Sequence, residues 1–352
     1  MWKEYINKIP NYDDSNLPKL LNKGFLKCFY VNNQFIKHMV LKKNESIIYA
    51  NIFSLRLKKG LQYNKSNFFV KFILRLLNLK IFYLGNWYLN NFHFFYLDKS
   101  HDIKNLLKDI KEDYSAIVLP DYLMRDFENK TNLDFIKVEI EEDMFFDVNN
   151  NWTSINDYIE CLKKKYKRRI EKVNLTSKDL IIKSLSNSDL KLYEDHMQLL
   201  FNQVVNNEKF SGPQFDVKTL LELSKNNFLS IYGYFDNNTL VAFSTYIEND
   251  KNLISYYVGF DKTLNEKYSL YSRILLESIK LGIEKNKSKI IFGRTANEFK
   301  SNFGATPVKS YIYIRFQNSI VHSIFKRIFK NNSIKKWVQR SPYNEVPELK
   351  SS

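Results

Sequence analysis

The sequence predicts an α/β protein with mixed sheets, an α+β arrangement, built from two tandem units. In each half of the chain, strand-like and helix-like runs follow one another in nearly the same order. The links DNNT and ENDK between strand-like runs of the second half are short and polar, which favours an antiparallel meander. A length of 352 residues, with 44% hydrophobic and 16% aromatic residues, is enough for two folded domains of ordinary size.

Three strands are predicted in the first half, followed by alternating helices and strands. The strands are 24–31, 34–42 and 46–57, and after a segment at 62–97 come helix 102–111, strand 115–119, helix 121–130 and strand 133–140. Three charges, Lys71, Arg75 and Lys80, interrupt the apolar stretch 68–84. We therefore expect that stretch to be a buried helix or to lie at a membrane surface, and not to span a bilayer.

The second half begins with apolar residues at helical spacing from Ile155 to Val173, after a start signal at 152–154. The elements that follow are helix 188–206, strands 229–235, 240–247 and 253–260, helix 269–285, strand 289–292, helix 295–304 and an alternating strand that ends at 316. A basic amphipathic helix at 320–338 is expected to pack over this second unit.

The stretch 288–316 contains the most specific local signals. Thr295 and Glu298 have the spacing of a capping box, and Gly304 followed by Pro307 supplies a helix stop. The predicted buried stripe of this helix is Ala296, Phe299 and Phe303, which leaves Glu298 and Asn302 together on another face. The strand before it ends in Gly-Arg, so backbone donors and the cation of Arg294 are expected where an anionic or polarised group binds.

Composition narrows the class of partner. The net charge of +16 indicates a polyanion such as RNA, acidic lipid or a phosphorylated substrate, or else a codon bias that enriches lysine throughout. Cys28 and Cys161 make no disulfide framework, and none of the five histidines pairs at i+3 or i+4, so neither disulfides nor a metal site is predicted. Without an apolar leader at the N-terminus, we expect a cytoplasmic protein, or one peripheral at the inner face of the membrane.

Three segments carry a family resemblance: YIECLKKKYKRRIEKV (158–173), LISYYVGFDKTLNEKYSLYSRILLESIKLGIEKN (253–286) and FGRTANEFKSNFGATPV (292–308). With them the chain resembles the GNAT acyltransferase superfamily, and most closely its double-domain branch with the FemAB aminoacyltransferases. The resemblance implies a degenerate N-terminal GNAT-like domain at 1–150, a transferase domain at 151–318 and a basic helical tail at 319–352. It also implies transfer of an acyl or aminoacyl group to an amine, in cell-envelope or secondary-metabolite assembly.

One departure from the superfamily bears on the acyl donor. GNAT enzymes that use acetyl-CoA have a glycine-rich loop before the central helix, whereas the matching stretch here, EKYSLYSRIL, contains no glycine. We therefore expect no tightly bound cofactor. Aminoacyl-tRNA is the favoured donor, and acyl-CoA or acyl carrier protein held differently stays open. The acceptor is expected to bear an amine, with or without a phosphate, and no motif indicates sequence-specific binding of nucleic acid.

Three residues are predicted to be catalytic. Arg294 is expected to clamp a carboxylate or phosphate, with a salt bridge to Glu298 as the alternative. Tyr257 is expected on the opposite face of the central strand from Tyr256, with a hydroxyl that orients the acceptor or donates a proton, or that merely fills the core. Glu298 is a candidate general base, although a capping role would occupy it.

A second group is predicted to bind substrate. Lys300 matches a lysine of the family motif and is expected to meet a phosphate. The basic helix is expected to dock a phosphate-bearing ligand, or to be only a solvated face. The substrate-binding set is Lys165, Lys167, Arg168, Arg169, Lys300, Tyr256 and Asn302. The hypothesis of another class is an inactive GNAT-like protein that binds a polyanion.

Overall fold

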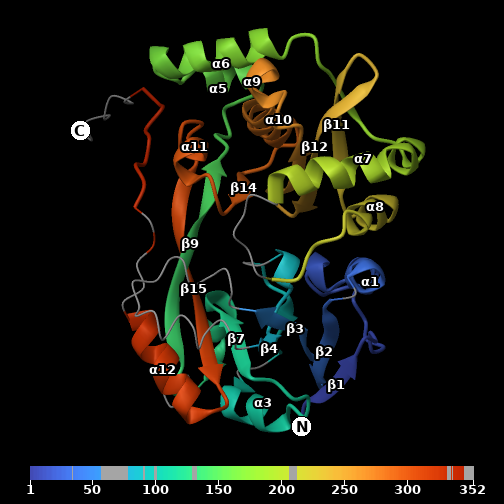
Figure 1. Cartoon of the computed structure of the whole chain (residues 1–352), viewed down its shortest axis with the longest axis vertical. Coiled ribbons are helices and arrows are strands. Elements are labelled where there is room, and N and C mark those ends of the chain that lie inside the picture. The colour runs from blue at the N-terminus through green and yellow to red at the C-terminus, as the bar shows by residue number, and fades with distance from the viewer. Residues whose placement is uncertain are drawn as a thin grey trace. The chain divides into compact units, whose positions relative to one another are not determined.

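The computed structural model describes residues 1–33, 35–56, 78–89, 92–98, 101–128, 133–205, 212–330, 334 and 336–344. The chain clusters into two compact units (Figure 1). Unit 1 comprises Met1–Ile140, Glu208–Asn226 and Ser310–Ile334, and unit 2 comprises Glu141–Asn207, Asn227–Lys309 and Lys335–Ser352. Each unit is assembled from separate segments, so the units differ from the contiguous ranges 1–150, 151–318 and 319–352 expected from the sequence.

Unit 1 contains a sheet in the order β1-β2-β3-β4-β7-β15. Strands β1 to β4 are antiparallel neighbours, β4 and β7 are parallel, and β7 and β15 are antiparallel. The elements of this unit are β1 (Lys3–Ile6), a 3-10 turn (Lys19–Leu21), α1 (Lys23–Asn32), β2 (Lys37–Lys43), β3 (Ser46–Arg56), β4 (Asn78–Tyr83), a second 3-10 turn (Trp87–Leu89), β5 (Phe95–Tyr96), β6 (His101–Asp102), α3 (Ile103–Asp109), β7 (Ala116–Pro120), α4 (Asp121–Arg125), β8 (Phe127–Glu128), α8 (Lys218–Lys225), most of β15 (Thr306–Phe316) and α12 (Ser319–Lys330).

Unit 2 repeats this order as β10-β11-β12-β13-β14-β9. Strands β10 to β13 are antiparallel neighbours, β13 and β14 are parallel, and β14 and β9 are antiparallel. The elements are most of β9 (Ile136–Asp147), α5 (Ile155–Glu160), α6 (Lys164–Thr176), β10 (Ile181–Ser184), α7 (Asn187–Val205), β11 (Ser230–Asp236), β12 (Thr239–Asn249), β13 (Asn252–Phe260), α9 (Asn265–Tyr268), α10 (Leu270–Glu284), β14 (Lys289–Gly293) and α11 (Asn297–Ser301).

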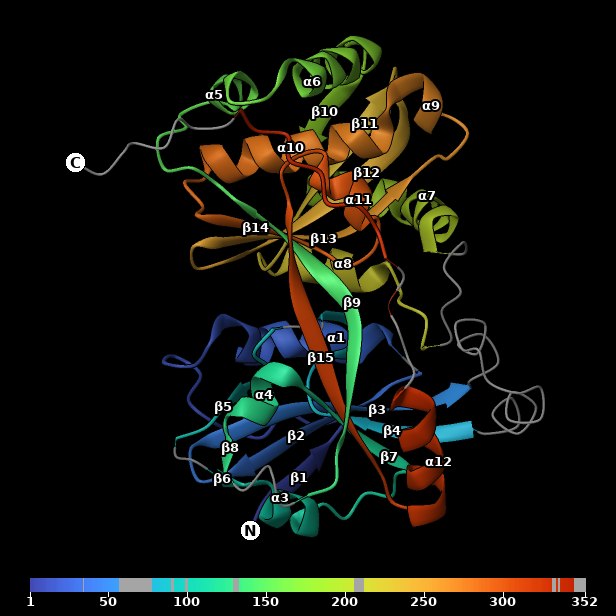
Figure 2. The same ribbon diagram turned by 90° about the vertical axis from the view of Figure 1, so that its left-hand side faces the viewer.

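The two sheets exchange their sixth strands. Strand β9 follows the unit 1 strand β7 in sequence but pairs with β14, and β15 follows β14 but pairs with β7 (Figure 2). The pairs include Phe146 with Ile290 in unit 2, and Ile314 with Val118 in unit 1. Apart from this exchange, the predicted duplication of a mixed α/β unit matches the observed strand order.

The predicted strand 24–31 is wrong, because this segment forms helix α1. The side chain of Asn22 caps the helix by accepting hydrogen bonds from the backbone N–H of Gly24 (2.9 Å) and of Phe25 (3.2 Å). Phe25 and Phe29, one helical turn apart, are fully buried. Two of the aromatic residues that suggested a strand therefore line the buried face of a helix, whereas the β-branched Val31 is exposed.

The single helix predicted after residue 152 is also wrong, because the chain breaks between α5 and α6. The backbone N–H of Lys163 donates to the carbonyl of Pro342 (2.8 Å), and the N–H of Asn344 donates to the carbonyl of Cys161 (3.0 Å). A distant segment thus takes backbone groups that a continuous helix would use. The predicted start is confirmed, since Ser154 and Asp157 form a capping box.

Three further expectations need correction. Helix α12 belongs to unit 1, not to the second unit, because Phe325 stacks on Phe316 of β15 with ring centroids 4.4 Å apart. In the apolar stretch 68–84, residues 78–83 form strand β4, and residues 68–77 lie outside the described residues. Helix α4 ends at Arg125, well before the predicted end at 130. Among the described residues, no helix is long and apolar enough to cross a membrane.

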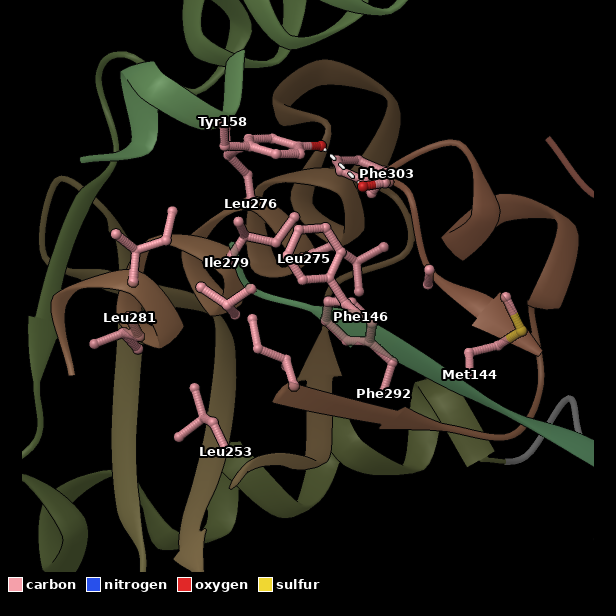
Figure 3. Packing of buried hydrophobic residues seen from close by; sticks show 14 of the residues in the cluster. Met144, Phe146, Tyr158, Leu253, Leu275, Leu276, Ile279, Leu281, Phe292 and Phe303 are labelled. Atoms are coloured by element: carbon pink, nitrogen blue, oxygen red, sulfur yellow. Dashed lines mark hydrogen bonds between the residues drawn. The ribbon is translucent and has the colours of Figure 1, made fainter. Parts of the chain in front are cut away.

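A buried cluster in unit 2 joins β9, β13, β14 and α10 (Figure 3). Its centre includes Phe146, Leu253 and Ile279, all nearly inaccessible to solvent. The hydroxyl of Tyr158 lies inside this cluster and donates to the carbonyl oxygen of Phe303 (3.1 Å) (Figure 3). This bond satisfies both buried polar groups and fixes the chain just after α11.

We expect Gly259→Ala to lower the free energy of unfolding by about 1–3 kcal/mol. A Cβ at this position of β13 would lie 2.7 Å from the backbone nitrogen of Phe201 in α7, which has no room to move. The matched control is Gly282→Ala in α10, whose Cβ would meet side-chain atoms alone, those of Ile290 and Val148, and not backbone. The alanine also has the higher helix propensity. Equal losses for the two variants in urea unfolding would contradict this account.

Candidate active site

A bulge interrupts the central strand β13 of unit 2. Strand β12 pairs Ser244 with Val258 and Tyr246 with Ser255, so two residues of β13, Tyr256 and Tyr257, lie opposite the single Thr245. Such a two-to-one arrangement bends the strand and redirects its side chains.

The buried side chain of Thr245 completes this bulge. Its hydroxyl donates to the carbonyl oxygen of Tyr257 (2.8 Å) and accepts from the backbone N–H of the same residue (3.0 Å). Both backbone groups are displaced from the regular ladder, and the hydroxyl is their replacement partner. Sequence reasoning missed Thr245, whose role depends on pairing between strands.

The bulge corrects the predicted separation of the two tyrosines onto opposite faces. The ring centroids of Tyr256 and Tyr257 lie 4.3 Å apart, and both side chains are half-buried. Burial raises the pKa of the Tyr257 hydroxyl, and a hydrogen bond with Tyr256 partly offsets this effect. The Tyr257 phenol therefore stays protonated at neutral pH and is suited to donate a hydrogen bond.

The pairing between strands β13 and β14 stops just before the bulge. Their parallel register covers Asn252–Ile254 of β13 and ends at the pair Ile254 and Ile291, although β13 itself continues to Phe260. Two residues beyond that pair lie Tyr256 on one strand and Gly293, the last residue of β14, on the other. Since parallel strands run in the same direction, the bulge and the Gly-Arg sequence lie beyond the same end of the paired stretch.

The chain leaves β14 through a strained corner, residues 293–296. Gly293, Thr295 and Ala296 have φ angles of 66°, 65° and 50°. The predicted capping box is therefore wrong: the N-cap residue of α11 is Ala296 instead of Thr295, and no side chain caps the helix. Ala296 and Phe299 are exposed rather than buried, whereas Phe303 is buried as predicted.

Left-handed backbone conformations at residues that tolerate them poorly are concentrated near this corner and at the start of α10. Within the described ranges, nine of the twelve positive φ angles fall on Gly, Asn or Asp, which tolerate them. The exceptions are Ser269, Thr295 and Ala296, at the start of α10 and at the corner. Left-handed conformations at such residues destabilise the chain by about 1–3 kcal/mol each and cluster at functional sites in proteins.

Lys300 holds the corner from inside. Its side chain is almost fully buried, and the ammonium donates to the carbonyl oxygens of Phe292 (2.9 Å), Gly293 (3.1 Å) and Arg294 (2.6 Å). These contacts compensate the loss of hydration of a buried ammonium. A phosphate, as predicted for Lys300, would have to replace these backbone carbonyls as the partner of the ammonium. The lysine acts here as a positioning residue for the corner.

Arg294 pairs with a carboxylate that the sequence analysis did not single out. Its Nε lies 3.6 Å from Oδ2 of Asp143 on β9, and the Asp143 side chain is only 7% exposed. The expected alternative partner, Glu298, is bound elsewhere. A signal for Asp143 was present in the sequence of β9, where the alternation of apolar and polar residues stops after Ile140. In the structure, the adjacent residues Asp143 and Met144 are both buried there.

Glu298 and Asn302 have local structural partners. Arg340 donates a hydrogen bond to the Glu298 carboxylate and holds its pKa below the ordinary value, which weakens it as a base. The amide of Asn302 donates to the carbonyl oxygens of Glu298 (2.9 Å) and Phe299 (3.1 Å) at the end of α11. These contacts favour structural roles for both residues.

The basic helix α6 turns most of its charges to solvent. Lys165, Arg168 and Arg169 are exposed, whereas Lys167 forms an ion pair with Glu160 (2.6 Å). The buried residues Ile170 and Val173 anchor the opposite face. Of the four basic residues of α6 that were predicted to bind substrate, three are therefore exposed and without the ion pair that Lys167 makes.

One backbone N–H at the start of α10 is bound by a side chain of the protein. The side chain of Asn265 accepts from the backbone N–H of Tyr271 (3.0 Å). The Tyr271 ring packs against Phe299 of α11, with centroids 5.3 Å apart. In acetyl-CoA-dependent GNAT enzymes, as the resemblance implies, the N–H groups at this place cradle a pyrophosphate.

Comparisons with known proteins identify the fold. No family model and no curated protein matches the sequence. Similar solved structures include a conserved protein of unknown function from Bacteroides thetaiotaomicron (13% identity, TM-score 0.52, 84% of this chain and 90% of that chain). FemX is also similar (9% identity, TM-score 0.51, 91% and 96% of the two chains).

This chain has a FemX-like fold. The C-terminal domain of a putative lysylphosphatidylglycerol synthetase from Agrobacterium fabrum is a further similar structure (10% identity, TM-score 0.50, 83% of this chain and 88% of that chain). The predicted resemblance to the double-domain FemAB-like branch is thereby confirmed for the fold. At these identities the likeness concerns the fold alone.

We expect Thr245→Val to lower the free energy of unfolding by about 1–3 kcal/mol, because both bonds to the Tyr257 backbone are lost. Thr245→Ser keeps the hydroxyl and is the matched control, with a smaller loss. Urea unfolding of the two variants provides the measurement. If valine and serine destabilise equally, the hydroxyl does not support the bulge.

A substitution that relieves backbone strain at the corner should stabilise the protein, in contrast to Thr245→Val. We expect Thr295→Asn to raise the free energy of unfolding by about 0.5–1 kcal/mol, because asparagine tolerates a left-handed conformation. Thr239→Asn is the control, at an exposed position of strand β12 where asparagine is disfavoured. Thermal unfolding that shows no gain for Thr295→Asn would argue against strain at this residue.

Proposed function

We propose that unit 2 transfers an acyl or aminoacyl group to an amine. The observation that carries this proposal is the strained corner with Arg294, which lies beyond the same end of the β13–β14 pairing as the bulged tyrosine pair. Strain that is maintained by a buried lysine is typical of functional sites. The fold is one that acyl and aminoacyl transferases use, which agrees with this chemistry.

Each group has a role in the proposed transfer. The amine attacks the carbonyl carbon of the donor, a C–N bond forms, the bond to the carrier oxygen or sulfur breaks, and one proton passes from the amine to the leaving group. Arg294, oriented by Asp143, binds an anionic group of donor or acceptor. The protonated hydroxyl of Tyr257 donates a hydrogen bond to the oxygen on which negative charge develops.

The favoured donor is an aminoacyl group carried on tRNA. The resemblance to the FemAB-like branch implies such a donor. In addition, Asn265 already binds the N–H of Tyr271 at the start of α10, which disfavours a pyrophosphate held in the usual GNAT manner. The exposed cations of α6, Lys165, Arg168 and Arg169, are suited to the phosphates of a large carrier. Acyl-CoA or acyl carrier protein is the alternative donor.

The Arg294–Asp143 pair provides a test that separates catalysis from stability. We expect Arg294→Gln and Asp143→Asn each to destabilise by about 1–3 kcal/mol, because each leaves a charge without its partner. The double variant restores a neutral pair and most of the stability. Amide formation from aminoacyl-tRNA, followed by mass spectrometry, should stay at least about a hundredfold below wild type in the double variant.

Arg125→Gln is the control for loss of an arginine ion pair, since Arg125 and Asp121 form an exposed pair in unit 1. Amide formation that recovers together with stability in the double variant would make Arg294 structural. Product from acyl-CoA but not from aminoacyl-tRNA selects the alternative donor.

The exposed cations of α6 also favour a second candidate function, recognition of a polyanion without catalysis. Charge reversal at Arg168 and Arg169 tests it better than reversal at Lys167, whose charge is paired with Glu160. Under this alternative, Arg168→Glu/Arg169→Glu abolishes tRNA binding at low salt, while no donor yields product with the wild-type protein.

A further inference from the structure

Helix α12 of unit 1 has one face anchored to its own unit. Phe325 is buried and stacks on Phe316, and its ring also contacts Phe329, with centroids 5.7 Å apart. The buried His322 lies on the same face, with Nε2 3.4 Å from Asp134. These contacts fix the rotation of the helix about its axis and therefore determine which residues point outward.

The outward face combines isoleucines with cations. Ile320 is 71% exposed and Ile324, one turn later, is 43% exposed. Arg327 follows at the next turn on the same face, and Lys330 lies one turn further; both are exposed. In the part of the chain that the structure describes, Arg327 and Lys330 make no ion pair with a carboxylate, whereas Lys326 pairs with Asp134 (2.6 Å).

We propose that the outward face of α12 docks on an anionic phospholipid bilayer. Ile320 and Ile324 enter the boundary between headgroups and acyl chains, and Arg327 and Lys330 contact the lipid phosphates. Exposed isoleucines beside unpaired cations are the residue pattern of helices that lie in the membrane interface. This inference concerns unit 1 and does not depend on the proposed transferase activity of unit 2.

Charge selects this face over another exposed apolar face of the molecule. Helix α7 also exposes two leucines, Leu192 (73%) and Leu199 (61%), but the exposed Asp195 lies between them on the same face. That carboxylate repels an anionic surface, so α7 serves as an internal control. A nucleic acid would use the cations of α12 but would leave its isoleucines in water, which makes the bilayer the better partner.

The test is co-sedimentation of the full chain with vesicles of phosphatidylcholine alone or mixed with phosphatidylglycerol. We expect binding only to the mixed vesicles. Ile320→Ser/Ile324→Ser should weaken the partition coefficient about tenfold, and Arg327→Glu/Lys330→Glu by about tenfold or more. Leu192→Ser/Leu199→Ser should leave it unchanged. All these side chains are exposed, so circular dichroism should show that each variant is folded.

Three outcomes would overturn the proposal. They are failure of the wild-type protein to bind the mixed vesicles, an equal loss in the α7 control, and wild-type binding by the isoleucine variant. If the charge variant instead loses affinity for polyuridylic acid while the isoleucine variant keeps it, the face binds nucleic acid. Transfer between water-soluble substrates should be unaffected by the α12 variants, which separates this test from that of the transferase.

Discussion

The buried ammonium of Lys300 is the interaction on which the candidate site depends. It gathers three consecutive carbonyl oxygens, from Phe292 to Arg294, at the place where the backbone turns left-handed. Without that cation these carbonyls would be buried without partners or the turn would relax. Because the turn sets the direction of Arg294, the lysine also determines how the guanidinium meets Asp143.

The duplicated sheets differ where the chemistry is proposed. In unit 1, the pairing of β3 with β4 runs without interruption from Asn51 and Tyr83 to Arg56 and Asn78. In unit 2, the corresponding pairing of β12 with β13 contains the bulge at Tyr256 and Tyr257. The strand order is thus a shared scaffold, and a local irregularity distinguishes one copy from the other.

Local patterns in the sequence predicted β11 to β13, α7, α10 and β14, because strand alternation, helical periodicity and short turns act between near neighbours. Such patterns do not predict contacts between residues that are far apart in the sequence. Backbone bonds from Pro342 and Asn344 break the helix after α5. The alternative expected from the sequence was a salt bridge between Arg294 and Glu298, but Arg294 pairs with Asp143 and Glu298 pairs with Arg340. The sequence singled out Arg294, Tyr256 and Tyr257 as candidate site residues. Their geometry could not be predicted, because it depends on left-handed dihedral angles at the corner and on the register shift between β12 and β13.

The strand exchange has a consequence for the order in which the chain is made. Strand β7 pairs with β4 on one side, and its partner on the other side is Ile312–Phe316 of β15. The sheet formed by β1 to β7 therefore leaves the ribosome with one edge open until nearly the whole chain has been synthesised. Such an edge is a template for pairing with other nascent chains. A chain halted after the first unit would therefore require a chaperone or would aggregate.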